Sequence, residues 1–375
     1  MSDRPSTTWA VIAGGGTGGH VVPAIAIARA LTGRGHPSDS IHFIGSTRGM
    51  EARMVPAAGF DVTLLPGRGI VRRLSRDNIG AVVGLIRAFA RAVVLMGRLR
   101  PAVTVAVGGY ASAAAALAAV LWRVPLVVAE QNAVPGLANR LAGRFAAACA
   151  VSFENTPLPR AVVTGNPVRP EIVSADTTDA GRASAREALG LPADAVVVAV
   201  AGGSLGARRI NDAVAELAGR WTRRGGICIY HVVGRRDFAE MSARAPVPVE
   251  GGLLYVQVEF EDRMDLLLAA ADVTLQRAGA STAAELAVIG VPSILVPLPG
   301  APGDHQTQNA RRLADAGAAV LVPDGELDAD RLEAELDRLV EDRAERRAMA
   351  GAARRLGRPD AAERVAALVE QHARG

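Results

Sequence analysis

Short apolar runs alternate with helical patterns along this chain from beginning to end, and this alternation limits the possible folds more than any other feature. Parallel strands that are buried on both faces read as short aliphatic runs, and the crossover helices between them supply the periodic segments. We therefore expect an α/β protein built on parallel sheets. The predicted strands are a run around Val11, Ile41–Ile44, Val62–Leu65, Val103–Val107, Leu126–Ala129, Ala148–Val151 and Val162–Thr164 in the first half, and Val196–Ala201, Ile227–Val232, Leu253–Val256, Val273–Leu275, Ser293–Val296 and Ala319–Leu321 in the second.

The second half of the chain begins as the first half does. Near the N-terminus the apolar residues 9–13 lead into the glycine-rich stretch Gly14–Gly19, and a helical pattern follows, with Pro23 in its expected first turn. Downstream, another apolar strand leads into Gly202–Ala207 and a helix from about Ile210. This duplication predicts two Rossmann-like domains separated by a deep cleft at the carboxyl ends of their strands, where such folds bind ligands.

A polar, proline-containing stretch marks the expected boundary between the two domains. It begins at Asn166–Pro170, so we expect an N-terminal domain over 1–168 and a C-terminal domain over 169–358. The tail reads as helices rich in Arg, Glu and Ala, which Pro359 interrupts. We expect the last helix, about 359–375, to pack back on the first domain.

The stretch Gly14–His20 has the composition of a phosphate-binding loop. Glycines let backbone N–H groups approach an anion closely, and the N-terminus of the following helix adds a favourable dipole. A tight turn without any ligand is the alternative, because a glycine-rich loop alone is a weak signal. The imidazole of His20 at the end of the loop and the second loop downstream favour a ligand site.

Composition and charge exclude several classes of protein. With 375 residues the chain is long enough for two domains, and a formal charge of +4 suits an anionic ligand or membrane surface without requiring nucleic acid. Arg87 and Arg91 interrupt the apolar segment Ala81–Met96, no uncharged run reaches the ~18–20 residues that span a bilayer, and no signal peptide is visible, so we expect a soluble protein. Cys149 and Cys228 lie in apolar runs and are expected to be buried thiols in a reducing cytosol.

Polar and glycine clusters follow several later strands. Turn chemistry alone explains each of them, but a shared position at the carboxyl ends of strands is what a ligand site requires. The second predicted strand ends at Ser46 without the acid that would hold a dinucleotide ribose, which weakens the case for a nicotinamide enzyme. The clusters are Gly108–Tyr110, Glu130–Asn132, Gly165–Pro167 and Gln276–Ser281.

Three acidic positions admit two interpretations each. Glu285 either closes a capping box onto Ser281 or Thr282, or accepts hydrogen bonds from vicinal ribose hydroxyls. Asp304 either caps the helix that begins there or belongs to a sugar-reading cluster with the amides after it. The Asp-x-Asp pattern at 328–330 formally matches a metal site, but it lies far from every predicted strand end, so we expect a solvated helix start and no metal.

Residues 67–100 combine many arginines with aliphatic side chains. A helix with a buried apolar face and solvated arginines is one interpretation, and a basic, apolar surface on anionic lipid is the other. Periodicity favours the first interpretation for the helix and favours lipid contact modestly for Gly67–Arg76.

The ordered set of motifs resembles the MurG family of GT-B glycosyltransferases, which act in peptidoglycan synthesis. The likeness runs from about Val11 to the C-terminal helix. The resemblance implies a GT-B fold, an N-terminal domain for a lipid-linked acceptor and a C-terminal domain for UDP-N-acetylglucosamine. The motifs that carry it are Gly14–His20, Gly108–Ser112, Glu130–Asn132, Gly165–Arg169, Gly202–Ala207, Ala278–Glu285 and Asp304–Asn309.

The resemblance also implies the reaction and its residues. N-acetylglucosamine would be transferred with inversion to the 4-hydroxyl of undecaprenyl-pyrophosphoryl-N-acetylmuramyl-pentapeptide, at the cytoplasmic face of the membrane, by a peripheral protein that contacts anionic lipids and needs no cofactor. His20 would be the base. The implied substrate-binding residues are Thr17, Gly18 and Gly19 near the donor, Asn132 and Gln306 at the sugar, Arg169 at the uracil or nearby groups, Ser204 at a phosphate, Phe260 and Glu261 over the uracil, Glu285 at the ribose, and Ala280, Ser281 and Thr282 beside it.

The sequence departs from the family pattern at three positions. Ala129 stands where a histidine is expected, Leu205 where glutamine is frequent and Ala278 where serine is common. The first removes any role for that imidazole, and the others leave backbone contacts intact. Rival interpretations are another GT-B transferase acting on a glycolipid or natural product, a UDP-N-acetylglucosamine 2-epimerase, and a non-catalytic nucleotide-sugar-binding protein.

Overall fold

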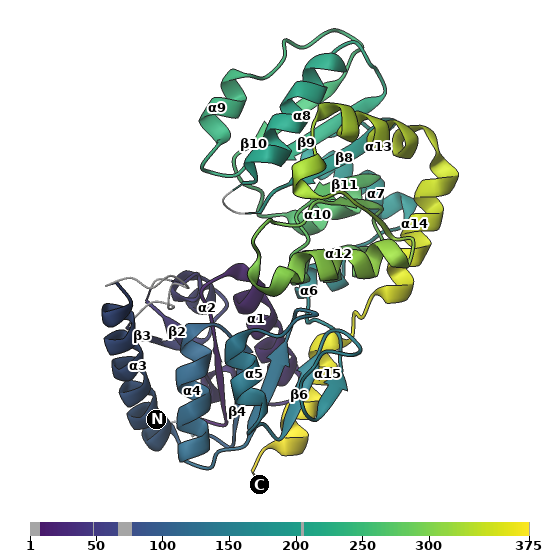
Figure 1. The fold of residues 1–375 in the computed structure, drawn as a ribbon. Helices are drawn as coiled ribbons and strands as arrows, with labels where there is room; N and C mark the ends of the chain where they lie inside the picture. Colours follow the sequence, from purple (N-terminus) through teal and green to yellow (C-terminus); the bar gives the residue numbers. More distant parts are fainter. Residues whose placement is uncertain (1–7, 48, 67–76, 204–205, 375) are drawn as a thin grey trace, which may run out of the picture. The chain divides into compact units, whose positions relative to one another are not determined.

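The computed structural model describes residues 8–47, 49–66, 77–203 and 206–374 (Figure 1). The chain divides into two compact units, one formed by 1–169 together with 358–375 and the other by 170–357. Each unit contains one sheet, and every strand pairing in both sheets is parallel. The parallel α/β architecture expected from the alternating pattern is therefore confirmed.

The sheet of the first unit has the strand order β3-β2-β1-β4-β5-β6-β7. The chain winds outward in one direction from β1 to β3 and then returns to the other side of β1 with β4. The point of reversal lies between β1 and β4, which pair along Ala10–Ala13 and Val103–Ala106. The strands are β1 (Ala10–Gly14), β2 (Ile41–Ser46), β3 (Asp61–Leu65), β4 (Val103–Gly108), β5 (Leu126–Glu130), β6 (Ala148–Val151) and β7 (Ala161–Val163).

Helices cover both faces of this sheet because successive strand residues point to opposite sides. Ala10 and Ile12 pack in one buried cluster with α1 and α15, whereas Val11 and Ala13 pack in another with α3 and α4. The helices of the first unit are α1 (Gly18–Gly33), α2 (Glu51–Ala57), α3 (Asp77–Leu99), α4 (Tyr110–Leu121), α5 (Leu137–Gly143) and α15 (Ala361–His372), with a short 3₁₀ turn η1 (Ser38–Ser40).

The C-terminal helix α15 completes the first unit although it follows the whole second unit in sequence. Val365, Ala366 and Val369 are buried in the same cluster as the apolar face of α1. At the surface, Glu370 accepts hydrogen bonds from Arg34 at 2.6 Å and lies 3.0 Å from His36 Nε2. Figure 1 shows this yellow helix among the purple and blue elements of the first unit.

The sheet of the second unit has the strand order β10-β9-β8-β11-β12-β13, with its reversal between β8 and β11. Val198 and Val200 of β8 pack on α8 and α13, while α7 packs on α10. The strands are β8 (Val196–Ala201), β9 (Ile227–Val232), β10 (Leu254–Val258), β11 (Val273–Gln276), β12 (Ser293–Leu295) and β13 (Ala319–Leu321). The helices are α6 (Pro170–Val173), α7 (Asp179–Leu189), α8 (Arg208–Arg220), α9 (Phe238–Ala243), α10 (Met264–Ala270), α11 (Ala280–Ile289), α12 (His305–Asp315), α13 (Ala329–Glu341) and α14 (Arg343–Leu356), with 3₁₀ turns η2 (Pro302–Asp304) and η3 (Asp324–Glu326).

Each predicted apolar run forms a strand, with ends that shift by one or two residues. The expected position of Pro23 is wrong, because α1 begins at Gly18 and Pro23 lies beyond its first turn. The glycines at the end of the loop thus belong to the helix itself. Both cysteines are free, buried thiols as expected, and burial raises the pKa of each to about 11. None of the helices in the described part of the chain has the length and apolar character that crossing a membrane requires.

Candidate functional site

Both glycine loops lie at the reversal points of their sheets. In the first unit, the loop after β1 and the turn after β4 meet there, since Gly15 N donates to Gly108 O at 3.3 Å. In the second unit, the loops after β8 and β11 occupy the corresponding position. Open parallel sheets bind their ligands at this position, because the loops on either side diverge and leave a crevice. Each unit therefore has its own candidate site.

The loop after β1 carries His20 against the turn after β4. The imidazole is half-buried, and its Nδ1 lies 3.4 Å from the Thr17 hydroxyl oxygen. Gly108 has a φ of +109°, and a Cβ built on it would lie 2.9 Å from His20 Nε2. Glycine is thus required at this turn both for its backbone conformation and for the approach of the imidazole.

A carboxylate that the sequence did not single out holds the other side of this loop. Glu51, the first residue of α2, is 1% exposed and accepts hydrogen bonds from Gly16 N at 2.9 Å and Ser46 N at 2.5 Å. As expected, β2 itself ends without an acid. Glu51 from the next helix nevertheless accepts a hydrogen bond from Ser46, the last residue of β2. No local pattern marks Glu51, because its partner Gly16 is distant in sequence.

The cluster after β5 is organised by Glu130. Its Oε1 accepts from the backbone N and side-chain amide of Asn132 at 2.9 and 3.2 Å, and its Oε2 accepts from Gly136 N at 3.0 Å and Asn139 Nδ2 at 2.9 Å. Asn139 also lies near Gly108, where a Cβ would be 3.4 Å from its Nδ2. The structure thus brings the predicted residues His20 and Asn132 into one connected region of the first unit.

The start of α11 tests one of the two interpretations of Glu285, the capping box. This helix begins at Ala280 with Gly279 as its N-cap, so Ser281 and Thr282 lie inside the first turn and Glu285 in the second. The predicted capping box is wrong, because it requires the acid three residues after the cap. Glu285 is 9% exposed, and the hydroxyl oxygen of Ser281 is buried without a partner among the described residues.

The segment 304–309 lies beside the loop before α11. Asn309 Nδ2 donates to Ala278 O at 3.2 Å, so α12 is joined to that loop through a backbone contact that any residue at 278 preserves. Gln306 Oε1 accepts from Leu298 N at 2.9 Å, which orients its amide NH₂ away from that backbone N–H. Asp304 is the N-cap of α12 by position, but its Oδ1 accepts from the Thr307 hydroxyl at 2.6 Å rather than from the backbone.

Phe260 and Glu261 lie in the loop between β10 and α10. Glu261 is buried and accepts from the Tyr230 hydroxyl at 2.6 Å and from Arg263 N at 2.9 Å. Burial opposes its ionisation, but these bonds outweigh it and lower the pKa of the carboxyl. Phe260 is exposed, with the Arg235 guanidinium 5.6 Å from its ring centre. The exposed ring suits ligand contact, whereas Glu261 shapes the loop.

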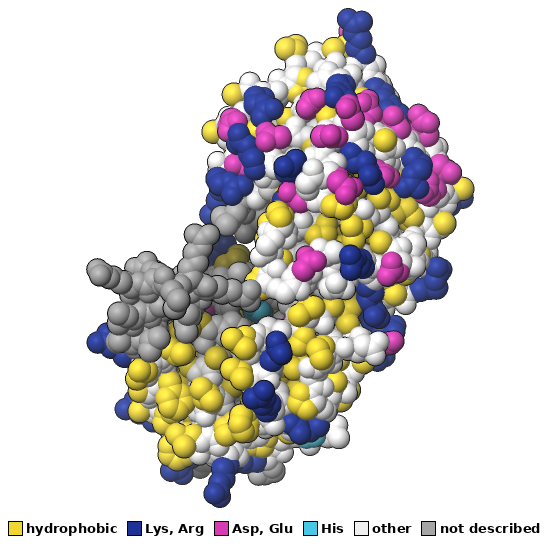
Figure 2. Space-filling view, viewed as in Figure 1, with side chains coloured by type: hydrophobic (Ala, Val, Ile, Leu, Met, Phe, Trp, Pro, Cys, Tyr) yellow, Lys and Arg dark blue, Asp and Glu magenta, His cyan; other side chains and the backbone are white. Residues whose placement is uncertain are grey.

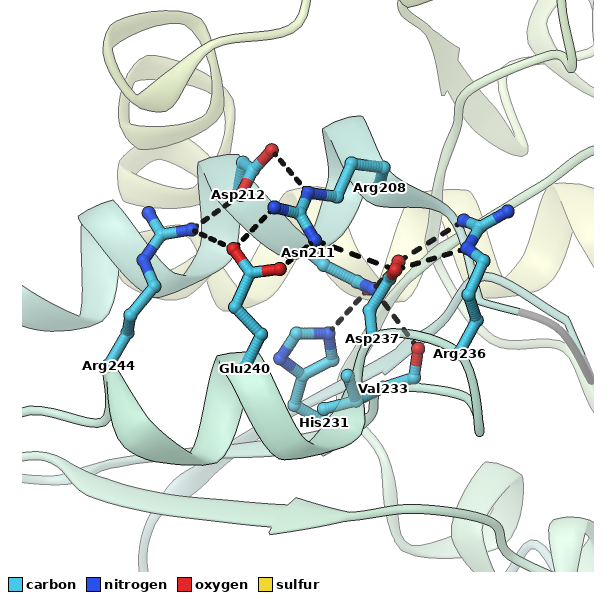
Figure 3. A network of polar contacts seen from close by, with 9 residues as sticks. All are labelled: Arg208, Asn211, Asp212, His231, Val233, Arg236, Asp237, Glu240 and Arg244. Atoms are coloured by element: carbon cyan, nitrogen blue, oxygen red, sulfur yellow. Dashed lines mark hydrogen bonds and ion pairs between the residues drawn. The ribbon is translucent and has the colours of Figure 1, made fainter.

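A polar network supports the second glycine loop (Figure 3). Asn211 of α8 donates from Nδ2 to Val233 O at 3.1 Å and to Asp237 Oδ2 at 3.0 Å. Gly206 has a φ of +81°, and a Cβ there would overlap the same Val233 oxygen. The N-terminus of α8 is thereby tied to the loop after β9. Around this core lie the ion pairs of Arg208 with Asp212, Asp237 and Glu240, of Arg236 with Asp237, and of Arg244 with Asp212 and Glu240.

His231 of β9 is a fully buried member of this network. Asn211 Nδ2 is used as a donor, so its Oδ1 must accept from His231 Nε2 at 3.1 Å. His231 Nδ1, 2.8 Å from the Tyr255 hydroxyl, then acts as the acceptor. Burial lowers the pKa of His231 to about 4, so the imidazole is neutral and serves the architecture of the loop.

The remaining predicted residues lie apart from these contacts. Asp328 caps α13 by accepting from Arg331 N at 2.8 Å, and Asp330 pairs with Arg220, so this pair is a helix start as expected. Among the described residues, no group of three or more His, Cys, Asp or Glu side chains is placed to hold a metal. Arg169 is half-buried at the end of the first unit, and Ser204 lies outside the described residues.

An exposed apolar surface covers three helices of the first unit (Figure 2). Helix α3 buries Ala88, Ala92 and Met96 but leaves Ile86 and Val94 exposed, so its apolar residues do not all face the core. Exposed arginines lie among them at 87, 91, 140 and 144. We call this the α3–α5 surface; its large apolar members are Ile86, Val94, Leu117, Leu121, Trp122, Leu137, Leu141 and Phe145.

Two doubly wound parallel sheets, each with a glycine loop at its reversal point, define the GT-B class of fold, and comparison with known proteins agrees. Residues 10–151 match the N-terminal domain of glycosyltransferase family 28, and residues 197–365 match its C-terminal domain. A curated relative from Acidothermus cellulolyticus is 44% identical over 363 residues, covers 97% of each chain and is named UDP-N-acetylglucosamine–N-acetylmuramyl-(pentapeptide) pyrophosphoryl-undecaprenol N-acetylglucosamine transferase. The chain belongs to glycosyltransferase family 28.

Solved structures support the same fold. The crystal structure of MurG from Acinetobacter baumannii matches with a TM-score of 0.75 and 28% identity, covering 97% of this chain and 99% of that one. A putative UDP-N-acetylglucosamine 2-epimerase from Listeria monocytogenes matches with a TM-score of 0.69 and 16% identity, covering 98% of this chain and 96% of that one. The second likeness concerns the fold alone.

Proposed function

We propose that this protein transfers N-acetylglucosamine from UDP-N-acetylglucosamine to the 4-hydroxyl of undecaprenyl-pyrophosphoryl-N-acetylmuramyl-pentapeptide, with inversion, releasing UDP. The observation that carries the proposal is the match, over nearly the whole chain, to a relative named for this transfer. The two glycine loops, each at the reversal point of its own sheet, support a reaction with two substrates.

The second unit, over about 169–358, is proposed to hold the donor. The N-terminus of α8 supplies a positive end for the diphosphate without a metal, and the loop with Ser204 approaches the same group. Glu285 accepts from the ribose hydroxyls, with Ala280, Ser281 and Thr282 beside it. The unpartnered, buried Ser281 oxygen supports this assignment, because a buried hydroxyl is normally bonded and a ligand would satisfy it.

The first unit, over about 1–168 with the last helix, is proposed to hold the acceptor and the base. His20 takes the proton of the attacking hydroxyl, because imidazole is the side chain most often used as a general base. Thr17, Gly18 and Gly19 approach the donor, and Asn132 and Gln306 contact its sugar. Arg169 lies at the uracil or nearby groups, and the loop with Phe260 and Glu261 closes over the uracil. Arg169 and the α8 dipole stabilise the departing UDP.

We further propose that the protein works as a peripheral protein at the cytoplasmic face of the membrane. The α3–α5 surface supports this, since exposed aliphatic and aromatic side chains among arginines suit anionic lipid. The basic stretch Gly67–Arg76, also proposed to contact lipid, lies outside the described residues.

The deciding experiment offers labelled UDP-N-acetylglucosamine and a panel of acceptors in the presence of EDTA, followed by linkage analysis of the product. Transfer to the 4-hydroxyl of the lipid-linked muramyl acceptor alone is the expected result. Transfer to another glycolipid or aglycone, epimerisation of the donor, or binding without turnover would each replace the proposal by the corresponding rival.

A further inference from the structure

Glu51 is a buried carboxylate that the proposed reaction does not use. It is 1% exposed, and it is surrounded by the backbone of Gly15, Gly45 and Gly49. A Cβ built on any of these three glycines would overlap the carboxylate or its side-chain methylenes. Glycine at these three positions therefore makes room for the side chain of Glu51 at this one place.

The two oxygens of Glu51 bind the ends of two neighbouring strands. Oε2 accepts from Gly16 N, just beyond β1, and Oε1 accepts from Ser46 N, the last residue of β2. In a phosphate-binding loop, such N–H groups are satisfied by the anionic ligand. Here an internal carboxylate already occupies the Gly16 N–H, so the loop has its shape before any substrate arrives.

Contacts lead from this carboxylate to the imidazole of His20. Gly15, next to the bound Gly16, donates from its N to Gly108 O at 3.3 Å. A Cβ on Gly109 would overlap Gly15 O, so the two turns are in direct backbone contact. Gly108 in turn lies against the His20 ring, within a distance that admits no Cβ. A shift of Gly15 and Gly16 therefore displaces the surface on which the imidazole rests.

We propose that Glu51 is a positioning residue, whose carboxylate holds Gly15 and Gly16 against the turn Gly108–Gly109 and so presents His20 to the acceptor hydroxyl. This inference rests on the proposed function and deepens it. One consequence is that Gly16 N–H does not bind a substrate diphosphate. The loop offers a substrate only its groups from Thr17 onward.

Glu51→Gln tests the proposal with little change in volume. An amide has one acceptor oxygen, so its NH₂ group faces one of the two backbone N–H groups and that bond is lost. Misplacement of a catalytic group by about 1 Å costs on the order of 10²-fold in rate. We expect kcat to fall by about that factor, while the KM for UDP-N-acetylglucosamine and the calorimetric Kd for UDP stay within about twofold.

Two controls on the same helix separate positioning from folding. Val55→Ala truncates a buried side chain of α2 and lowers the stability of the first unit while the carboxylate of Glu51 is kept, and Arg53→Ala changes an exposed residue. Both should keep native kcat in the folded protein. If Val55→Ala lowers kcat as much as Glu51→Gln does, the effect is one of stability and the proposal is overturned.

Hydrogen–deuterium exchange supplies a readout that does not depend on activity. Glu51→Gln should speed exchange in peptides covering 14–20 and 108–112 and leave peptides of the second unit unchanged. A wild-type protein without transferase activity would reject the proposed function, while this exchange result would still decide the role of Glu51 in the loop. Native kcat and native exchange in Glu51→Gln would overturn the inference.

Glu51→Asp is the second variant should Glu51→Gln not fold. It keeps the charge but withdraws the carboxylate by one methylene, so it cannot reach both N–H groups, and the same loss of kcat is expected. Failure of both variants to fold would assign Glu51 to folding and overturn the positioning role.

Discussion

The imidazole of His20 rests on Gly108, and its Nδ1 lies 3.4 Å from the Thr17 hydroxyl. Its setting differs from the settings of His36 and His42 in the same unit. His36 stacks on Trp9 and pairs with Glu370, and His42 bonds to the Thr63 hydroxyl. His20 is therefore the imidazole placed at a ligand-shaped loop, which is the basis of the first prediction.

His20→Ala should lower turnover by about 10²–10⁴-fold, because the acceptor hydroxyl loses its base. Calorimetric affinity for the donor should change little, and the acidic limb of the pH–rate profile should vanish. His42→Gln, in the same unit, is the control and should keep both. A folded His20→Ala protein with near-native turnover would remove the base assignment, whereas a loss confined to donor affinity would indicate a structural role.

Glu285→Ala should weaken UDP-N-acetylglucosamine binding by roughly 1–3 kcal/mol, because the ribose hydroxyls lose their charged acceptor in a buried setting. Isothermal calorimetry measures this directly as about a 5- to 150-fold rise in Kd. Glu187→Ala, which changes an exposed acid of the same unit, should leave Kd unaltered. Unchanged donor affinity in a folded Glu285→Ala protein would exclude Glu285 from the site.

Elements, rather than single side chains, carry the second glycine loop. The network of Asn211, His231 and Asp237 joins the start of α8 to the end of β9 and the start of α9 (Figure 3). Burial lowers the pKa of His231 in the folded chain below its value in the unfolded chain. As the pH falls, the unfolded chain therefore binds a proton at His231 before the folded chain does. The network should therefore become less stable in acid.

The free energy of unfolding of the second unit should fall between pH 6.5 and pH 4. The folded pKa of His231, about 4, lies below the unfolded value of 6.5, so the stability contribution is complete above 6.5 and is lost toward 4. The loss amounts to about 3 kcal/mol. Urea unfolding followed by Trp221 fluorescence, with Trp9 and Trp122 replaced by Phe, measures it. In His231→Gln the total fall in the free energy of unfolding between pH 6.5 and pH 4 should be smaller by that amount, and an identical fall would contradict the prediction.

The α3–α5 surface should bind anionic vesicles through its apolar side chains. Leu141→Asp combined with Phe145→Asp should reduce binding by at least about tenfold, because burial of each apolar side chain contributes roughly 1.5–3 kcal/mol to the free energy of binding. Turnover of a short, water-soluble acceptor should be spared. Val247→Asp, at an 81% exposed apolar residue of the second unit, is the matched control. Equal vesicle binding by all three proteins would assign the surface another role.

Salt separates the two contributions to that binding. The arginine contribution should shrink as the Debye length falls from about 10 Å at 0.1 M to about 3 Å at 1 M, while the apolar contribution persists. The second unit has a different kind of surface, because charges of both signs intermingle over α8 and α13 (Figure 2). Those charges pair with one another, as in Arg220 with Glu216 and Glu333.

At the scale of the whole molecule, the chain leaves the first unit at 169 and returns to it at 358. The last helix α15 buries Val365, Leu368 and Val369 there, which closes one face of the sheet. The stability of the N-terminal residues therefore depends on the C-terminal ones.

Deletion of 358–375 should destabilise the first unit by roughly 5 kcal/mol or more, because the core loses the burial of three large aliphatic side chains. Amide exchange should rise across α1 and the first sheet and stay unchanged in the second unit. Glu370→Ala, which removes the surface pairs with Arg34 and His36, should cost about 0–1 kcal/mol. Undiminished protection of α1 after the deletion would contradict this account of α15.

The strands and loops of both sheets were predictable from the sequence, because a buried parallel strand and the glycine turn after it are local patterns. The same holds for the free thiols and for Asp328 as a helix cap. His20 could be singled out for the same reason, since it ends the glycine stretch. These local patterns do not depend on which elements contact one another in the folded protein.

Only the tertiary structure decided the features that depend on partners distant in sequence. Glu51 binds Gly16 across 35 positions, and Asn309 of α12 donates to Ala278 O, in the loop before α11, across 31 positions. The helix α11 itself begins at Ala280 with Gly279 as its N-cap. The exposed residues of α5 look like core in the sequence, since a helical pattern does not say which neighbours cover it. Hydrogen bonds and burial form between elements, and the order of the strands determines which elements meet.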